Sequence, residues 1–254
     1  MSDIKKRACF EAHDIWAAFS MLTRLKVPVD HKRAGERANA ATWAFPIVGA
    51  IIGGLAGFVI MVANALMLPV SFSAALALLT LIALTGAMHE DGLADCADGF
   101  WGGHTRERRL EIMKDSSIGA YGTVILIVIL LAEWSAIETL ALSNPVLTFA
   151  AVGAISRIPM IIALRVIPNA RETGLAVAVG IPQLCSIQIA CGLTVLISFL
   201  CLGIPGLIIL IIGTLSALPV FLIAKAKIGG QTGDVLGASQ KCAELGTLAA
   251  VLIF

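Results

Sequence analysis

Charged residues are scarce in this sequence of 254 residues. Asp, Glu, Lys and Arg make up 14% of the chain, whereas an ordinary soluble domain has about 25%. With 58% hydrophobic residues, the chain is not of the disordered class. The net charge of +1 also excludes a protein that binds nucleic acid through bulk positive charge.

Several sequence motifs are also missing. The six cysteines contain no CxxC pair and no Cys/His zinc spacing, and Cys96 and Cys242 are expected in cytoplasmic loops where thiols stay reduced. We therefore assign the cysteines no chemistry. Neither GxxxxGK[ST] nor a strand-associated GxGxxG occurs, so the two common nucleotide-binding folds are not supported.

Long apolar stretches dominate the sequence instead. A membrane-spanning helix needs about 20 mostly apolar residues, and six stretches of the sequence are long enough. A seventh apolar stretch, 245–254, is shorter and is long enough only for a half-span or a packed helix. Backbone N–H and C=O groups inside a lipid bilayer must form hydrogen bonds within the protein, so apolar segments of this length are expected to be helical. The predicted fold is a single all-α membrane domain over 1–254, a bundle of six to seven transmembrane helices. The six full stretches are 43–67, 70–88, 119–141, 145–165, 184–202 and 204–224.

The basic residues predict how the chain is oriented. Eight of the 18 Lys and Arg lie in residues 1–42, and most of the others lie in the loops 89–118, 166–183 and 225–244. The opposite connections contain none. By the positive-inside rule, the amino terminus and these three loops face the cytoplasm.

Residues 1–42 are expected to stay on the protein as a cytoplasmic or interfacial segment. Their basic start is not followed by a continuous apolar core, so it does not resemble a signal peptide. Apolar residues from Phe10 to Leu25 recur at nearly helical spacing and end near Pro28, which predicts an amphipathic helix. This helix either lies in the membrane interface or covers the cytoplasmic ends of the bundle.

The loop 89–118 holds a cluster of carboxylates. Asp91, Asp95 and Asp98 are spaced i, i+4 and i+7, so on a helix they share one face. Like charges at this spacing repel unless a cation neutralises them, and oxygen ligands suit Mg²⁺. Asp115 extends the set. The alternative is a solvated loop whose acids only balance neighbouring Arg and Lys side chains.

Two further segments are candidates for binding anions. The segment 229–238, GGQTGDVLGA, could present backbone N–H groups and the Thr232 hydroxyl to phosphate, or it could be an ordinary turn. Arg157 lies inside a predicted span, where an unpaired charge is costly, so we expect it to meet a substrate phosphate or a buried carboxylate. The loop 169–174, NARETG, follows that span. Glu133 is expected at the far membrane interface.

These segments resemble a known family. TGAMHEDGLADCADG (85–99), RRLEIMKDSSIGAYG (108–122) and GGQTGDVLGA (229–238) are similar to the signature segments of cobalamin synthase, or adenosylcobinamide-GDP ribazoletransferase. Weaker similarity extends over essentially the whole chain. Thr173 and Lys241 depart from the pattern, because acids are common at both places in the family.

The resemblance implies a reaction and a site. α-Ribazole, or its 5′-phosphate, would attack adenosylcobinamide-GDP with release of GMP and a requirement for Mg²⁺. Carried onto this chain, the metal ligands are Asp91, Asp95, Asp98 and Asp115, and the catalytic residues are Asp98, His89 and Asp115. Substrate binding falls to Lys114, Arg157, Thr232 and Asp234.

The resemblance also implies where the protein works and with what. It is expected in the cytoplasmic (inner) membrane as a multi-pass protein with its active site facing the cytoplasm. Its partners would be the two substrates, the lipid bilayer, and either a second copy of the chain or other corrinoid-assembly enzymes, with no nucleic acid.

Two alternatives remain at the level of sequence. A CDP-alcohol phosphotransferase also places an Asp cluster at a membrane face, but its DxxDGxxAR signature is not met, because Gly102 and Gly103 stand where the signature has Ala and Arg. A cation transporter would need acids in several spans, and these spans contain almost none apart from Glu133.

Overall fold

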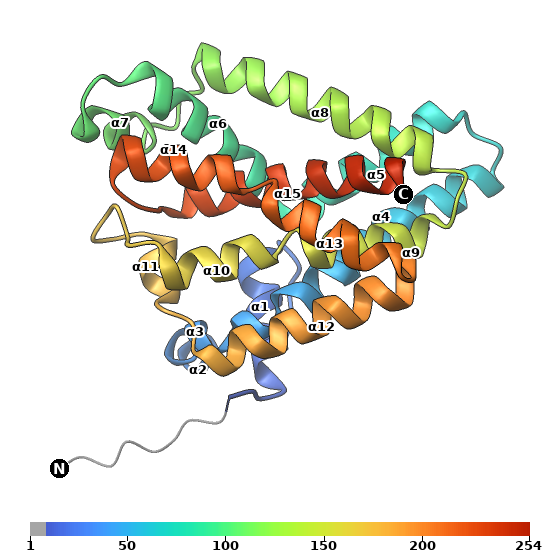
Figure 1. Cartoon of the computed structure of the whole chain (residues 1–254), viewed down its shortest axis with the longest axis horizontal. Helices are drawn as coiled ribbons and strands as arrows, with labels where there is room; N and C mark the ends of the chain where they lie inside the picture. Colours follow the sequence, from blue (N-terminus) through green and yellow to red (C-terminus); the bar gives the residue numbers. More distant parts are fainter. Residues whose placement is uncertain (1–8) are drawn as a thin grey trace.

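The computed structural model describes residues 9–254, and this part of the chain is built from helices and short loops (Figure 1). The basic start of the predicted amphipathic segment, within residues 1–8, lies outside the described residues. No strand occurs from residue 9 onward, so the expected all-α fold is confirmed. The elements are α1 (His13–Leu22), α2 (His31–Glu36), α3 (Ala38–Ala41), η1 (Thr42–Ala44), α4 (Phe45–Ala65), α5 (Val70–Thr85), α6 (Met88–Gly102), α7 (Arg106–Ile112), α8 (Ala120–Leu140), α9 (Pro145–Ile155), α10 (Ile158–Val166), α11 (Leu175–Val179), α12 (Leu184–Leu202), α13 (Pro205–Leu215), α14 (Leu218–Ile228) and α15 (Gly233–Ile253).

The chain is a multi-pass membrane protein. Among the described residues, five helical segments are long and apolar enough to cross a bilayer, and a sixth is added if α5 and α6, which meet at 86°, form one broken span. All six predicted apolar stretches contain helix. The five segments are Ala38–Ala65, Ala120–Leu140, Pro145–Val166, Leu184–Leu202 and Pro205–Ile228.

The carboxyl-terminal segment 245–254 belongs to a packed helix, one of the two forms predicted for it, but this helix begins earlier than predicted. Residues 245–254 are not a separate half-span, because they are the end of the 21-residue helix α15, which begins at Gly233. The predicted loop 225–244 is therefore mostly helical. Its only irregular part is the turn between Gly229, whose left-handed φ of 80° ends α14, and Thr232, which caps α15. The sequence did not reveal the start of α15, because the four glycines within residues 229–238 resemble a turn.

Two predicted spans are interrupted. Pro159 and Pro219 each stand in the first turn of a new helix, α10 and α14 respectively. Proline has no N–H to donate to the preceding turn, so a helix that reaches it ends and restarts. The first of these breaks falls at Ser156 and Arg157, in the middle of the bundle.

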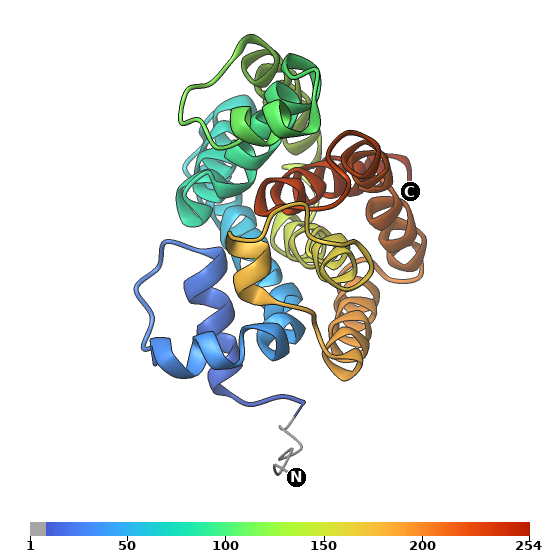
Figure 2. The same cartoon turned by 90° about the vertical axis from the view of Figure 1, so that its left-hand side faces the viewer.

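The predicted polar loops gather at one end of the bundle. In Figure 1 the short helices α2, α3, α7 and α11 lie toward the left, and the connection between α8 and α9 lies at the opposite end. Figure 2 looks onto the left end, with α11 near its middle. Arg106 joins the three loops there, since its guanidinium donates to the carbonyls of Ile228 (2.9 Å) and Ala170 (2.7 Å).

Helices α4 and α9 form the most closely packed pair of the bundle. Gly49 and Gly153 face one another, and a Cβ on either would lie within 2.1 Å of the other's carbonyl oxygen. Only glycine permits this approach, which is typical of packing between membrane helices. The pair forms a rigid centre around which the other helices are arranged.

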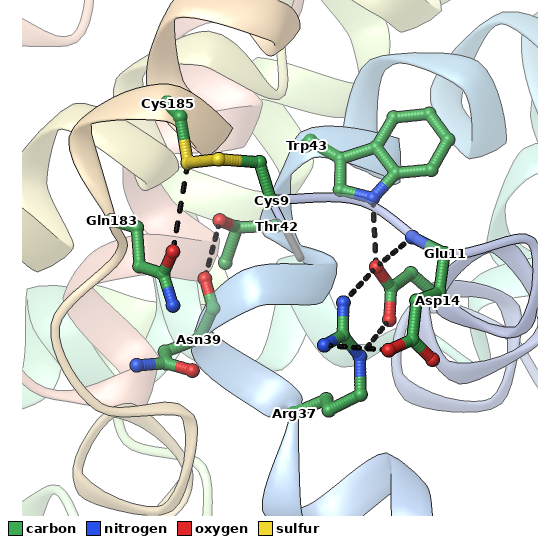
Figure 3. Close-up of a disulfide and its surroundings, with 9 residues drawn as sticks. All are labelled: Cys9, Glu11, Asp14, Arg37, Asn39, Thr42, Trp43, Gln183 and Cys185. Carbon is green, nitrogen blue, oxygen red and sulfur yellow. Dashed lines mark hydrogen bonds and ion pairs between the residues drawn. A yellow bond between two sulfur atoms is a disulfide. The ribbon is translucent and has the colours of Figure 1, made fainter. Parts of the chain in front are cut away.

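The amino-terminal helices cover part of the polar end. The Asp14 carboxylate accepts hydrogen bonds from the Arg37 guanidinium (2.8 Å) and from the Trp43 indole N–H (3.0 Å), as Figure 3 shows. All three side chains are buried. Helix α1 is thereby fixed to the segment from Arg37 to Trp43 that leads into α4, which favours the covering helix over one that lies free in the interface.

Cysteine chemistry is present where the sequence predicted none. Cys9 and Cys185 form a disulfide between the segment before α1 and the first turn of α12 (Figure 3). The two residues are 176 positions apart, so no local spacing could have indicated the pair. Among the described residues, Cys96, Cys191, Cys201 and Cys242 remain free thiols.

Candidate active site at the α6–α15 contact

Helix α6, which carries the Asp cluster, is set by a sharp bend. Gly86 ends α5 with a φ of 66°, and Ala87 has a φ of 58°, a conformation that is uncommon outside glycine. These two left-handed residues turn α6 by 86° from α5. As a result α6 runs across the bundle and brings its polar face to α15.

Two glycines bring α6 and α15 into contact. A Cβ on Gly92 would lie 2.8 Å from the carbonyl oxygen of Asp234, and a Cβ on Gly237 would lie 3.3 Å from the Cα of His89. The backbone of α15 therefore approaches α6 beside its first acids. The prediction that Asp91 and Asp234 belong to one site rested on two separate motifs, and the fold brings these motifs together.

The loop 169–174 is pinned beside the same contact. Residues 169 and 231 form an isolated parallel bridge, in which the Ala170 N–H donates to the Gln231 carbonyl (2.8 Å). The Gln231 N–H donates in return to the Pro168 carbonyl (2.8 Å). This bridge fixes the loop against the turn that precedes α15.

Arg171 of that loop reaches the site. Its guanidinium donates to the Asp234 carboxylate (3.1 Å) and to the Leu110 carbonyl (3.1 Å), and its Nε has no partner among the described residues. The Thr232 hydroxyl also donates to Asp234 (3.1 Å) and accepts from the Val235 N–H (3.3 Å). Thr232 thus caps α15 and orients the carboxylate at the same time.

The neighbours of Asp234 shift the pKa of its carboxyl in opposite directions. Burial raises the pKa of its carboxyl above the ordinary value, and the Asp91 carboxylate raises it further, whereas Arg171 and Thr232 oppose the shift. Asp95 is half-buried and interacts electrostatically with Asp91, Asp234 and Arg171. Three acidic side chains therefore share one guanidinium, and burial and their mutual repulsion raise the pKa of Asp95 to about 7.

Asp98 points elsewhere. Its two carboxylate oxygens accept hydrogen bonds from the backbone N–H groups of Gly119 (2.7 Å) and Gly122 (2.9 Å), at the start of α8. The N–H groups of a helix's first turn lack partners within the helix, and a carboxylate there is favourable. The spacing i, i+4 and i+7 predicted one face, but α8 draws the third carboxylate away from Asp91 and Asp95.

Lys114 and Asp115 lie on the connection between α7 and α8. Both are exposed, and the Asp115 carboxylate accepts from the Ser117 N–H (3.0 Å), which lowers the pKa of its carboxyl. Asp115 and Asp98 line an open hollow of about 370 Å³. The structure therefore groups Asp115 with Asp98 and leaves Asp91, Asp95 and Asp234 as a second group.

Arg157 and His89 lie inside the bundle. Arg157 is 2% exposed and donates to the Ser156 hydroxyl (2.8 Å) and to the Gly153 carbonyl (3.3 Å). Its charge interacts electrostatically with Glu90 and Glu244, but it forms no ion pair with a carboxylate among the described residues, so its contact with an anion stays a prediction. His89 is also 2% exposed, and neither of its ring nitrogens has a partner within residues 9–254.

A buried charge cluster surrounds these two residues. Lys241 pairs with Glu133 (2.8 Å) and with Glu90 (3.1 Å), and Glu244 lies 3.8 Å away. The prediction of Glu133 at the far interface is wrong, since its side chain is fully buried. A sequence shows that a span contains one acid, but not that a lysine 108 positions away faces it.

The donor atoms near α15 fit a divalent cation. No group of three or more His, Cys, Asp or Glu side chains in the described part of the chain is placed to hold a metal ion together. Mg²⁺ seldom uses such a group, because it binds one or two carboxylates and completes its shell with water and substrate phosphate. Asp91, Asp95 and Asp234 are the acids from which one or two such ligands could come.

One residue of this group was not assigned from the sequence. The loop 169–174 was noted, but the cations chosen for anion binding were Lys114 and Arg157. Arg171 is the basic residue of that loop, and its position directly after the fourth span was the available signal. What the sequence could not show is the bridge between residues 169 and 231 that carries Arg171 to Asp234.

Comparison with known proteins identifies the family. The family model described as cobalamin-5-phosphate synthase matches residues 14–252. A protein of Bradyrhizobium diazoefficiens named adenosylcobinamide-GDP ribazoletransferase is 40% identical over 91% of this chain and 90% of its own length. A Brucella ovis protein with the same name is 38% identical over 94% of this chain and 95% of its own. No solved structure matches. The chain therefore belongs to the cobalamin-5-phosphate synthase family.

Proposed function

We propose that this protein is an adenosylcobinamide-GDP ribazoletransferase. The curated relatives carry that name, and this chain matches nine-tenths or more of their length. The observation that supports the proposal in the structure is the cluster of Asp91, Asp95 and Asp234 around Arg171, built where the three polar loops meet. Such a cluster suits a substrate that carries a diphosphate and a metal ion.

The reaction exchanges the phosphoanhydride bond of the GDP-linked substrate for a phosphate ester. A ribose hydroxyl of α-ribazole, or of its 5′-phosphate, attacks the phosphorus atom joined to cobinamide, and the bond from this phosphorus to the oxygen of the leaving GMP breaks. The hydroxyl proton must leave during the attack, and negative charge develops on the departing phosphate. The products are GMP and adenosylcobalamin, or its 5′-phosphate.

Each polar residue of the cluster has a role in this scheme. One or two of the carboxylates of Asp91, Asp95 and Asp234 would hold Mg²⁺, which when bound polarises phosphoryl oxygens and neutralises charge on the leaving group. Arg171 can turn from Asp234 to a phosphate oxygen, a contact that guanidinium groups make well. Thr232 keeps Asp234 in place, and a carboxylate of the cluster or His89 accepts the hydroxyl proton.

Orientation in the membrane is part of the proposal. The excess of basic residues in the polar loops supports an active site on the cytoplasmic side of the inner membrane. GMP would then be released into the cytoplasm. The buried position of Glu133 against Lys241 gives no support to a cation pathway through the spans, and the CDP-alcohol signature is absent.

The test is transfer by purified protein in lipid vesicles. Protein is given adenosylcobinamide-GDP and Mg²⁺, with α-ribazole, with its 5′-phosphate or with neither, and GMP and the corrinoid product are quantified. The proposal predicts GMP release that depends on the acceptor and matches product formation one to one. Release of GMP without an acceptor, or CMP from a CDP-alcohol under the same conditions, would contradict it.

A further inference from the structure

A cavity of about 120 Å³ lies directly beside the candidate site. Helices α1, α4, α6, α10, α11 and α15 all contribute to its wall, which is mostly apolar and includes Phe45, Met160 and Leu164. At its polar edge stand His89, Asp91 and Asp234. The cavity is thus continuous with the carboxylates assigned to catalysis, while its interior offers few hydrogen-bonding groups.

The polar edge distinguishes this cavity from a packing defect. His89 lines it, is almost fully buried, and has no hydrogen-bond partner for either ring nitrogen among residues 9–254. Leaving such a group unsatisfied costs about 1–3 kcal/mol. A buried imidazole with this cost indicates that a bound molecule completes its hydrogen bonds.

The size of the cavity limits what can enter. An engineered protein cavity of about 150 Å³ lined by Leu, Ile and Phe binds benzene. The present cavity, at about 120 Å³, accommodates one small aromatic group with modest adjustment of its flexible Met side chains. A corrin macrocycle or an intact nucleoside diphosphate is far too large.

We infer that this cavity is the subsite for the benzimidazole base of the α-ribazole acceptor, an inference that rests on the proposed function. The dimethylbenzimidazole is the small apolar aromatic group of the two substrates, and its unsubstituted ring nitrogen can accept a hydrogen bond from His89. Guanine fits poorly because its several N–H and C=O groups would lack partners against the apolar wall. With the base inside, the ribose emerges beside Asp91 and Asp234, where its hydroxyl must react.

The test fills the cavity and measures acceptor binding. Met160→Phe adds bulk to the wall, and Val195→Phe adds the same ring to a separate apolar hollow bordered by α12 and α13. Isothermal titration with α-ribazole gives its Kd, and steady-state kinetics give KM for each substrate. We expect Met160→Phe to raise the Kd for α-ribazole by about tenfold or more, while its KM for adenosylcobinamide-GDP stays within about twofold of the wild type. Val195→Phe should leave the Kd for α-ribazole unchanged.

A second variant guards against misfolding. Leu175 lines the cavity but is 44% exposed, so Leu175→Phe narrows the cavity with little strain in the core. Unchanged α-ribazole affinity in both filling variants, with a wild type that still transfers, would overturn the subsite alone. A wild type that neither binds α-ribazole nor releases GMP would instead overturn the proposed function.

Discussion

Lys241 and Glu133 form an ion pair in the interior of the bundle, with 2.8 Å between Nζ and Oε2 and both side chains at most 1% exposed. Lys241 also contacts Glu90, the residue beside Asp91 on α6. The lysine that departs from the family pattern therefore joins α15 to α6 and α8 at once. Burying two charges costs desolvation energy, which their mutual attraction offsets. If one partner is removed, the other charge stays buried without compensation.

Replacement of Lys241 should destabilise the protein strongly. Lys241→Met leaves the carboxylates of Glu90 and Glu133 buried without their cation, and we expect the free energy of unfolding to fall by about 3–5 kcal/mol. The control is Lys32→Met on the exposed helix α2, expected within about 0.5 kcal/mol of the wild type. Denaturant unfolding in detergent measures both. Equal stability of Lys241→Met and wild type would contradict the pairing.

The contact between Asp14 and Arg37 should make stability depend on pH. Burial alone would raise the pKa of the Asp14 carboxyl, but hydrogen bonds from Arg37, Trp43 and the Glu11 backbone outweigh it and lower the pKa below the ordinary 3.8. A lowered folded pKa means that ionised Asp14 stabilises the fold above pH 3.8, and that this contribution is lost as pH falls through the folded value.

Asp14→Asn tests this dependence. The thermal midpoint of the variant should lie below that of the wild type at pH 7, and the gap should close as pH falls below 3.8. Glu107→Gln on exposed α7 should follow the wild type throughout. A gap of constant size across this range would show that ionisation of Asp14 contributes nothing.

Asp98 and Asp95 should respond differently to the same substitution. Asp98→Asn replaces an oxygen that accepts from Gly119 or Gly122 with an amide donor, so we expect a loss of about 1–2 kcal/mol in the free energy of unfolding. Asp95→Asn removes repulsion from Asp91 and Asp234 and should leave stability equal or higher. Thermal unfolding without Mg²⁺ compares them. Equal destabilisation by both would refute the separate roles.

The Cys9–Cys185 disulfide should stabilise the amino-terminal cover. Cys9→Ser is expected to lower the free energy of unfolding by about 2–4 kcal/mol, since the bond closes a long segment of chain. A reducing agent should bring the wild type to the same stability and leave Cys9→Ser unaffected. Cys201→Ser, which removes a free thiol, serves as control. No response of the wild type to reduction would exclude a stabilising bond.

The sequence predicted the helical spans because lipid permits few alternatives. Apolar stretches near α4, α5, α8 and α12 were located to within a few residues, since composition and length suffice there. Breaks at Pro159 and Pro219 and the full length of α15 were missed. A glycine-rich turn and a glycine-rich helix start look alike until the partner helix, here α6 at Gly92, is known.

The sequence predicted which residues belong to the candidate site better than it predicted how they are arranged. Asp91, Asp95 and Asp234 come together as the separate motifs suggested. Asp98 does not join them, because the start of α8 offers its carboxylate two N–H groups. Arg171 joins through a backbone bridge that no spacing rule describes.

In the proposed mechanism, carboxylates between α6 and α15 hold the metal that assists transfer. The direct measurement is the rate of GMP release as Mg²⁺ is titrated, for wild type, Asp95→Asn and the exposed control Glu107→Gln. We predict that Asp95→Asn lowers the rate or the apparent Mg²⁺ affinity by about 100-fold, while Glu107→Gln matches the wild type. An Asp95→Asn protein with a wild-type rate and a wild-type Mg²⁺ dependence would contradict the claim.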